Sequence, residues 1–131
     1  MPDGAAHITV NNRPLTWWYE HDTGTETLST LTDKARRYSR LYSHEGYRSR
    51  HMALFEITKP GREANFHHAL AGTGLALPVA TATSQDDLDP LSAVWWPLGH
   101  PACSRRRLTE LPVVELPSTP ARTRRCPWNP K

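Results

Sequence analysis

The feature that most constrains the fold is an apolar strand signal that ends in acidic residues and leads into a helix, Trp17-Trp18-Tyr19-Glu20-His21-Asp22-Thr23-Gly24-Thr25-Glu26. Glu20 and Asp22 are two residues apart, so on a strand both side chains leave the same face. Thr23 and Glu26 have the spacing of a capping box, and an apolar stripe at helical steps of three and four follows them. The pattern predicts a strand that turns on Gly24 and leads into a long helix.

The other segments predict a sheet around this strand. Weak alternation over residues 6–10 and the turn cluster Asn11-Asn12-Arg13-Pro14 indicate an antiparallel hairpin with a central strand at residues 15–22. The long helix is expected from about residue 25 to about residue 44. The order of the elements predicts an α/β fold with a mixed sheet. Its remaining elements are strands near 52–58, 75–83 and 93–98 and a second helix over 62–71.

Length and charge divide the chain in two. With 131 residues, we expect one α/β domain over residues 1–102 and an irregular, flexible Arg/Pro-rich tail over 103–131. The tail holds seven Arg or Lys against two Glu, a net charge of +5, which leaves −2 on residues 1–102. Tails of this kind often contact nucleic acid, although solvated arginine clusters are also common. The candidate DNA-binding residues are Arg105, Arg106, Arg107, Arg122, Arg124 and Arg125.

The chain shows no sign of a membrane segment or a signal peptide. No run of 18 apolar residues occurs, and the first residues lack the basic and apolar order of a secretory signal. We therefore expect a cytoplasmic protein without a membrane partner.

Three carboxylates are the strongest candidates for chemistry. If the hairpin forms, Asp3 opens one strand beside the end of its neighbour, where Glu20 and Asp22 lie. Asp3, Glu20 and Asp22 would then offer oxygen ligands to Mg²⁺ or Mn²⁺, and Lys34 on the flank of the helix would orient a phosphate or a water. This is the equipment for metal-assisted phosphodiester cleavage. The alternative is that Glu20 and Asp22 are ordinary polar residues at a strand exit and that Lys34 is an ordinary ion on a helix flank.

Several of these motifs together resemble the replication-relaxation family of bacterial plasmids and integrative elements. They are Pro2-Asp3, the string from Tyr19 to Glu26, Lys34-Ala35-Arg36-Arg37-Tyr38, and Val94-Trp95-Trp96-Pro97-Leu98 followed by Arg105-Arg106-Arg107-Leu108. The resemblance implies a role in plasmid replication and DNA relaxation, with DNA as a partner. Family members carry a winged-helix region before this part. We therefore expect a separate or truncated gene product, with a winged-helix partner or another replication protein.

The same order of residues is also similar to a restriction-endonuclease-like core, which implies a three-layer fold of a mixed sheet with flanking helices. In that core a lysine usually stands two residues after the second carboxylate, where this chain has Asp22. We expect Lys34 to take that role from the following helix. The resemblance implies a metal-dependent DNA endonuclease or nickase with Asp3, Glu20, Asp22 and Lys34 as catalytic residues.

Two alternatives stay open. The first is a non-catalytic remnant of the nuclease-like domain that acts as a DNA-binding or protein-assembly module. The second is a small regulatory DNA-binding protein that works through its basic tail.

Overall fold

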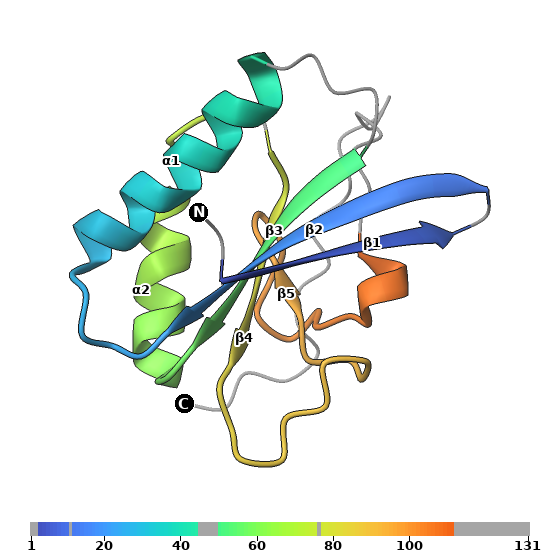
Figure 1. Ribbon diagram of the computed structural model, residues 1–131. Helices are drawn as coiled ribbons and strands as arrows, with labels where there is room; N and C mark the ends of the chain where they lie inside the picture. Colours follow the sequence, from blue (N-terminus) through green and yellow to red (C-terminus); the bar gives the residue numbers. More distant parts are fainter. Residues whose placement is uncertain (1–2, 11, 45–49, 76, 112–131) are drawn as a thin grey trace.

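Five strands form one mixed sheet in the order β1-β2-β3-β4-β5, and two helices pack against it (Figure 1). The computed structural model describes residues 3–10, 12–44, 50–75 and 77–111. The strands are β1 (Gly4–Val10), β2 (Arg13–Asp22), β3 (Arg50–Ile57), β4 (Val79–Thr83) and β5 (Trp96–Pro97). The helices are α1 (Leu28–His44), α2 (Pro60–Leu70) and the short 3₁₀ helix η1 (Leu108–Glu110).

The strand connections explain why both helices cover one face of the sheet. β1 and β2 form an antiparallel hairpin that turns through Asn12 at a positive φ of 62°, a conformation that asparagine tolerates well. β2, β3 and β4 are parallel and are joined through α1 and α2. Both crossovers step in the same direction along the sheet, so right-handed connections place both helices on the same side. Figure 1 shows this arrangement, with the two helices side by side.

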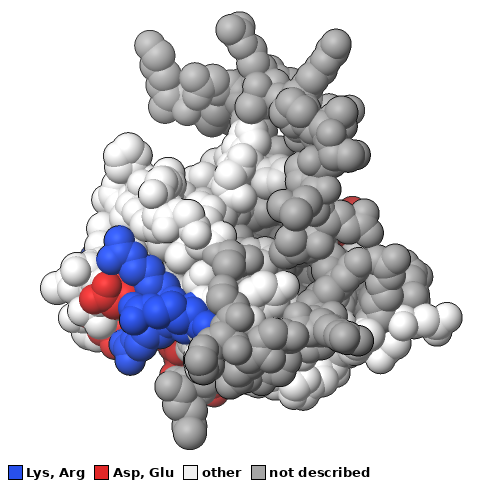
Figure 2. Space-filling model, turned by 90° about the horizontal axis from the view of Figure 1, so that it is seen from above, with Lys and Arg blue, Asp and Glu red and all other residues white. Residues whose placement is uncertain are grey.

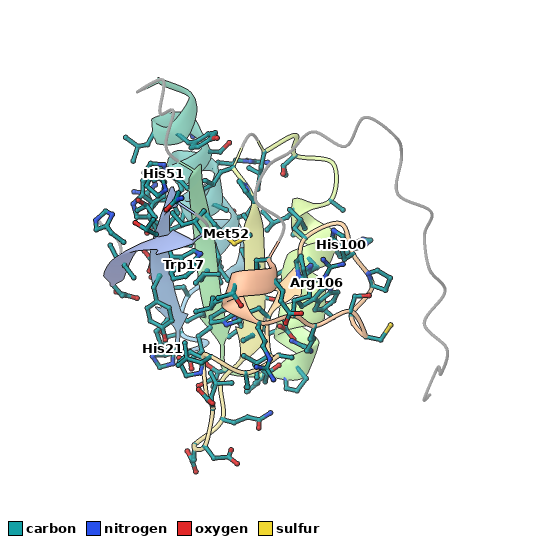
Figure 3. All side chains as sticks on the ribbon, turned by 90° about the vertical axis from the view of Figure 1, so that its right-hand side faces the viewer. Trp17, His21, His51, Met52, His100 and Arg106 are labelled. Atoms are coloured by element: carbon teal, nitrogen blue, oxygen red, sulfur yellow. The ribbon has the colours of Figure 1, made fainter. Side chains whose placement is uncertain are left out.

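Alternation along the strands supplies a separate core to each face of the sheet. On the helical side, residues such as Ala53 and Phe55 of β3 pack against α1 and α2. On the other side, Trp17 and Met52 belong to a second core (Figure 3). Neither α1 nor α2 covers this second core; residues 94–111, which include η1, cross it and contribute the buried side chains of Trp95 and Leu111. The sheet therefore lies between a helical layer and an irregular layer.

The start of α1 differs from the prediction. The helix begins at Leu28, and Thr27 caps it, because its Oγ1 accepts a hydrogen bond of 3.1 Å from the Thr30 amide. The expected capping box of Thr23 and Glu26 does not form. Gly24 turns the chain at a φ of 84°, which keeps this stretch outside the helix, and the Glu26 carboxylate contacts Lys34 instead.

The mixed α/β sheet is confirmed, and the strand predicted at residues 15–22 lies inside the sheet as β2, next to the middle strand β3. The described part of the predicted tail packs against the domain. The backbone of Arg106 pairs with that of Trp95 as an isolated bridge, and Leu111 is buried. The folded chain thus continues through Leu111, past the predicted boundary at residues 102 and 103. Residues 112–131, with Arg122, Arg124 and Arg125, lie outside the described residues.

Within the described residues, no helix is both long enough and apolar enough to cross a membrane.

Candidate functional site

The carboxyl ends of the three parallel strands lie along one edge of the sheet. β2 ends at Asp22, β3 at Ile57 and β4 at Thr83, and each register pairs these ends with one another. In open α/β sheets, ligands bind at this edge. Here it carries three buried carboxylates, those of Glu20, Asp22 and Glu63, which are 1–3% exposed.

The β1–β2 hairpin brings Asp3 beside Glu20, as predicted. The register pairs Gly4 with Tyr19, and the Asp3 carboxylate accepts a hydrogen bond of 2.8 Å from the His21 amide, which lowers the pKa of Asp3. Burial raises the pKa of Glu20; the Tyr38 hydroxyl opposes this rise, and a hydrogen bond with Asp3 adds to it. The two carboxyl groups therefore form a pair in which Glu20 is the member that holds a proton more readily.

The side chains that close over Glu20 come from α1. The Tyr38 hydroxyl donates to Glu20 Oε1, and Lys34 Nζ lies 3.7 Å from Glu20 Oε2. Lys34 also donates to Glu26 Oε1 at 3.0 Å, and this hydrogen bond raises the pKa of Lys34, which keeps it cationic. A cavity of about 110 Å³ opens here, lined by Glu20, Lys34, Arg37, Tyr38 and Leu41.

Asp22 does not join this pair, although it lies on the same face of β2 as Glu20. Arg62 of α2 binds it through two hydrogen bonds, from Nε to Oδ2 at 2.5 Å and from Nη2 to Oδ1 at 3.0 Å. The Gly24 amide donates to Oδ1 as well, at 3.2 Å. The first turn of α2 thus neutralises Asp22. Of the four predicted catalytic residues, the structure brings together Asp3, Glu20 and Lys34.

The predicted metal ligands are therefore two neighbouring carboxylates and a third that is already bound to an arginine. In the ranges that the structure describes, no group of three or more His, Cys, Asp or Glu side chains is arranged to hold a metal ion.

The third buried carboxylate, Glu63 of α2, was not among the predicted residues. Arg105 donates to both of its oxygens, at 2.6 and 3.0 Å, and Thr81 and Thr83 donate at 2.6 and 3.0 Å. Burial opposes ionisation of Glu63, but these hydrogen bonds and the charge of Arg105 outweigh it and lower its pKa. Arg105, which the sequence predicted to bind DNA, is paired with a buried group of the domain.

His67 extends this network. Its Nε2 lies 2.7 Å from Thr81 Oγ1, and because the Thr81 hydroxyl donates to Glu63, Nε2 must carry the hydrogen of this contact. The ring stacks on Trp96 at 3.5 Å, and burial lowers the pKa of His67 to about 4. The sequence did contain a signal for both groups. Glu63, Phe66, His67 and Leu70 follow the helical spacing i, i+3, i+4, i+7 of a buried stripe.

The fold and these contacts define an α/β protein with a carboxylate pair under a lysine at the carboxyl ends of its strands. Residues 1–58 match the sequence profile of the replication-relaxation family. The family resemblance is therefore confirmed for this part of the chain, which contains β1, β2, α1 and β3. The search of curated proteins and the search of solved structures return no match.

Proposed function

We propose that the protein acts on DNA during the replication of a plasmid or mobile element, through a metal-dependent phosphodiester site formed by Asp3, Glu20 and Lys34. The observation that carries this proposal is the meeting of the Asp3 and Glu20 carboxyl groups beneath the ammonium group of Lys34. All three residues lie within the part of the chain that matches the replication-relaxation family. The proposal includes the restriction-endonuclease-like interpretation of this core.

The donor set fits Mg²⁺ or Mn²⁺. Magnesium sites commonly use one or two carboxylates and complete their coordination with water and substrate phosphate. Asp3 is exposed and Glu20 is buried, so the pair offers one oxygen donor open to solvent and one that is fixed by the fold. A bound divalent cation would neutralise charge on the phosphate and activate a water molecule.

The residues of the chain have separate roles in this proposal. Asp3 and Glu20 would hold the cation through their carboxylate oxygens, and the cation would neutralise the negative charge of the pair. Tyr38 fixes the orientation of Glu20 by donating to Oε1. Lys34, which is 27% exposed, donates to a phosphate oxygen or to the attacking water.

A second candidate function is a non-catalytic module for DNA binding or protein assembly. One observation favours it: the protein itself already supplies donors to the carboxylates of β2. Tyr38 and Lys34 contact the two oxygens of Glu20, and Arg62 neutralises Asp22. In that case these groups stabilise the fold.

A nicking assay separates the two functions. Supercoiled plasmid is incubated with the protein in Mg²⁺, in Mn²⁺ and in EDTA, and the conversion to nicked circles is measured. We expect metal-dependent nicking that Asp3→Asn, Glu20→Gln and Lys34→Met each reduce by about a hundredfold or more. Asp33→Asn is the matched control, because it removes an exposed carboxylate from the same helix as Lys34.

Nicking that survives Glu20→Gln would contradict the proposed site. If the wild-type protein binds the plasmid and leaves it intact with either metal, the non-catalytic function is the correct one. Circular dichroism of each variant checks that the fold is retained.

A further inference from the structure

The solvent-facing side of α1 is strongly basic. The helix buries Leu31, Ala35 and Tyr38 against the sheet, and Asp33 is the only acidic residue among its 17 residues. Its opposite side exposes Arg36, Arg37 and Arg40, which we call the α1 arginine face. Figure 2 shows Lys and Arg side chains gathered into one patch on the side of the molecule where α1 lies.

The guanidinium groups of the α1 arginine face are available to an external anion. Arg37 and Arg40 form no ion pair with any residue that the structure describes. Arg36 lies 3.6 Å from Asp33, but both side chains are more than half exposed. An exposed pair of this kind contributes little and exchanges readily for another partner.

The arginines of the C-terminal segment differ in this respect. Arg105 is held by the buried carboxylate of Glu63, and the backbone of Arg106 is bridged to Trp95. Of the three arginines at residues 105–107, only Arg107 is mainly exposed. Among the arginine side chains that the structure describes, the mainly exposed ones are therefore Arg36, Arg37 and Arg40 on α1 and Arg107 in the C-terminal segment.

The α1 arginine face is continuous with the candidate site. Arg37 lines the 110 Å³ cavity together with Glu20 and Lys34. A chain of phosphates bound to Arg40 and Arg37 would therefore extend to the ammonium group of Lys34. A planar guanidinium binds a phosphate through two parallel hydrogen bonds, which suits this residue type to a sugar-phosphate backbone.

We infer that the α1 arginine face binds the phosphate backbone of DNA, without reading its sequence, and directs one phosphate toward Lys34 and Glu20. The inference rests on the proposed function, since it names the surface that presents DNA to the same site. It also explains how DNA can approach two carboxyl groups, because the three arginines of the α1 arginine face offset the repulsion between the phosphates and these carboxyl groups.

The test is the salt dependence of DNA binding. A fluorescein-labelled DNA duplex is titrated by anisotropy over a range of NaCl concentrations, in EDTA so that no cleavage occurs. Each phosphate contact contributes a slope of about −0.9 to log K against log salt. We expect the double variant Arg37→Gln/Arg40→Gln to flatten the slope by about 1.8.

The control is Lys59→Gln, which removes a positive charge from an exposed position outside α1. It should leave the slope unchanged. Glutamine has nearly the helix propensity of arginine, so the α1 variant should fold, which thermal melting verifies.

Three outcomes would overturn the inference: an unchanged slope in the α1 variant, an equal change in the control, or binding to anionic lipid vesicles without binding to DNA. The result is independent of catalysis. A flattened slope without nicking supports the α1 surface and refutes the nuclease. Nicking that requires Glu20, together with an unchanged slope in the α1 variant, supports the nuclease and refutes DNA binding by the α1 arginine face.

Discussion

Arg62 binds Asp22 through two hydrogen bonds, although the two residues are 40 positions apart in the sequence. The Asp22 side chain is 1% exposed and that of Arg62 is 16% exposed, so the contact is a buried ion pair between β2 and α2. Arg62 also donates to the Glu26 carbonyl at 2.5 Å, which fastens the loop that precedes α1. One arginine thus connects a strand, a loop and a helix.

We predict that Arg62→Met lowers the free energy of unfolding by about 3 kcal/mol, because it leaves the Asp22 carboxylate buried without a partner. Urea denaturation measures the loss. The control is Arg36→Gln, whose partner Asp33 is exposed, and this variant should change stability by less than about 0.5 kcal/mol. Equal effects in the two variants would mean that the Asp22 pair is no more important than a surface contact.

The cap of α1 gives a prediction about two threonines. Thr27→Ala should destabilise the protein by about 1 kcal/mol, because the Thr30 amide loses its acceptor. Thr23→Ala should have a much smaller effect, because among the described residues the Thr23 hydroxyl is hydrogen-bonded to the exposed hydroxyl of Thr25 and not to a helix amide. A larger loss in Thr23→Ala, measured by thermal melting, would restore the capping box that the sequence predicted.

Glu63 should make the protein acid-sensitive. Its pKa in the folded state lies below the ordinary value of 4.5, so its contribution to stability is complete above that pH and is lost as the pH falls through the folded-state pKa. In Arg105→Met, the strongest cause of the lowered pKa is gone and burial dominates. This variant should be less stable at pH 7 and should lose less stability in acid than the wild type, as urea denaturation at both pH values would show.

His67 should add to the same acid sensitivity at a higher pH. Its pKa is about 4 in the folded state against 6.5 when unfolded, so the unfolded chain binds a proton first as the pH falls from 6.5 to 4. Stability is complete above pH 6.5 and decreases by about 3 kcal/mol over this interval. His67→Gln, which keeps a donor for Thr81, should remove this decrease. The exposed neighbour His68 is the control, and His68→Gln should retain it.

Metal binding should raise the melting temperature through Asp3 and Glu20. A ligand that binds only the folded state adds about 2.7 kcal/mol at a hundredfold excess over its dissociation constant. Asp3→Asn and Glu20→Gln should abolish the shift in Mn²⁺. Asp22→Asn should lower the melting temperature but keep the shift, because Arg62 already binds Asp22. A wild-type curve that does not respond to Mn²⁺ would remove the metal from the proposed function.

The local part of this fold could be predicted from the sequence because local signals determine it. The turn at Asn12, the apolar strand and the helical stripe of α1 each depend on a few neighbouring residues. Together with antiparallel pairing, they also predicted the meeting of Asp3 and Glu20. Strand β4 is shorter than expected: it begins at Val79, directly after Pro78, which has no amide hydrogen to donate to a strand.

The ion pairs at the candidate site could not be predicted, because they depend on contacts between residues that are far apart in the sequence. The pairs of Asp22 with Arg62 and of Glu63 with Arg105 span 40 and 42 positions, and no short sequence pattern predicts them. The basic composition after residue 103 indicated a nucleic-acid contact, but composition does not show that Arg105 faces a buried carboxylate. Conversely, no sequence pattern distinguishes the arginines of α1 from an ordinary solvated helix face, and only the fold shows that Arg37 lines the same cavity as Glu20.

The position of residues 94–111 on the second face of the sheet has a consequence for biosynthesis. A ribosome releases the two helices before this segment, so the hairpin and the helical layer can assemble while Trp17 and Met52 still face the solvent. The nascent chain carries an uncovered apolar surface until Trp95 and Leu111 emerge, and an incomplete chain of this kind is prone to aggregation. A stop codon placed between β4 and Trp95 would therefore give a product that needs a chaperone to stay in solution.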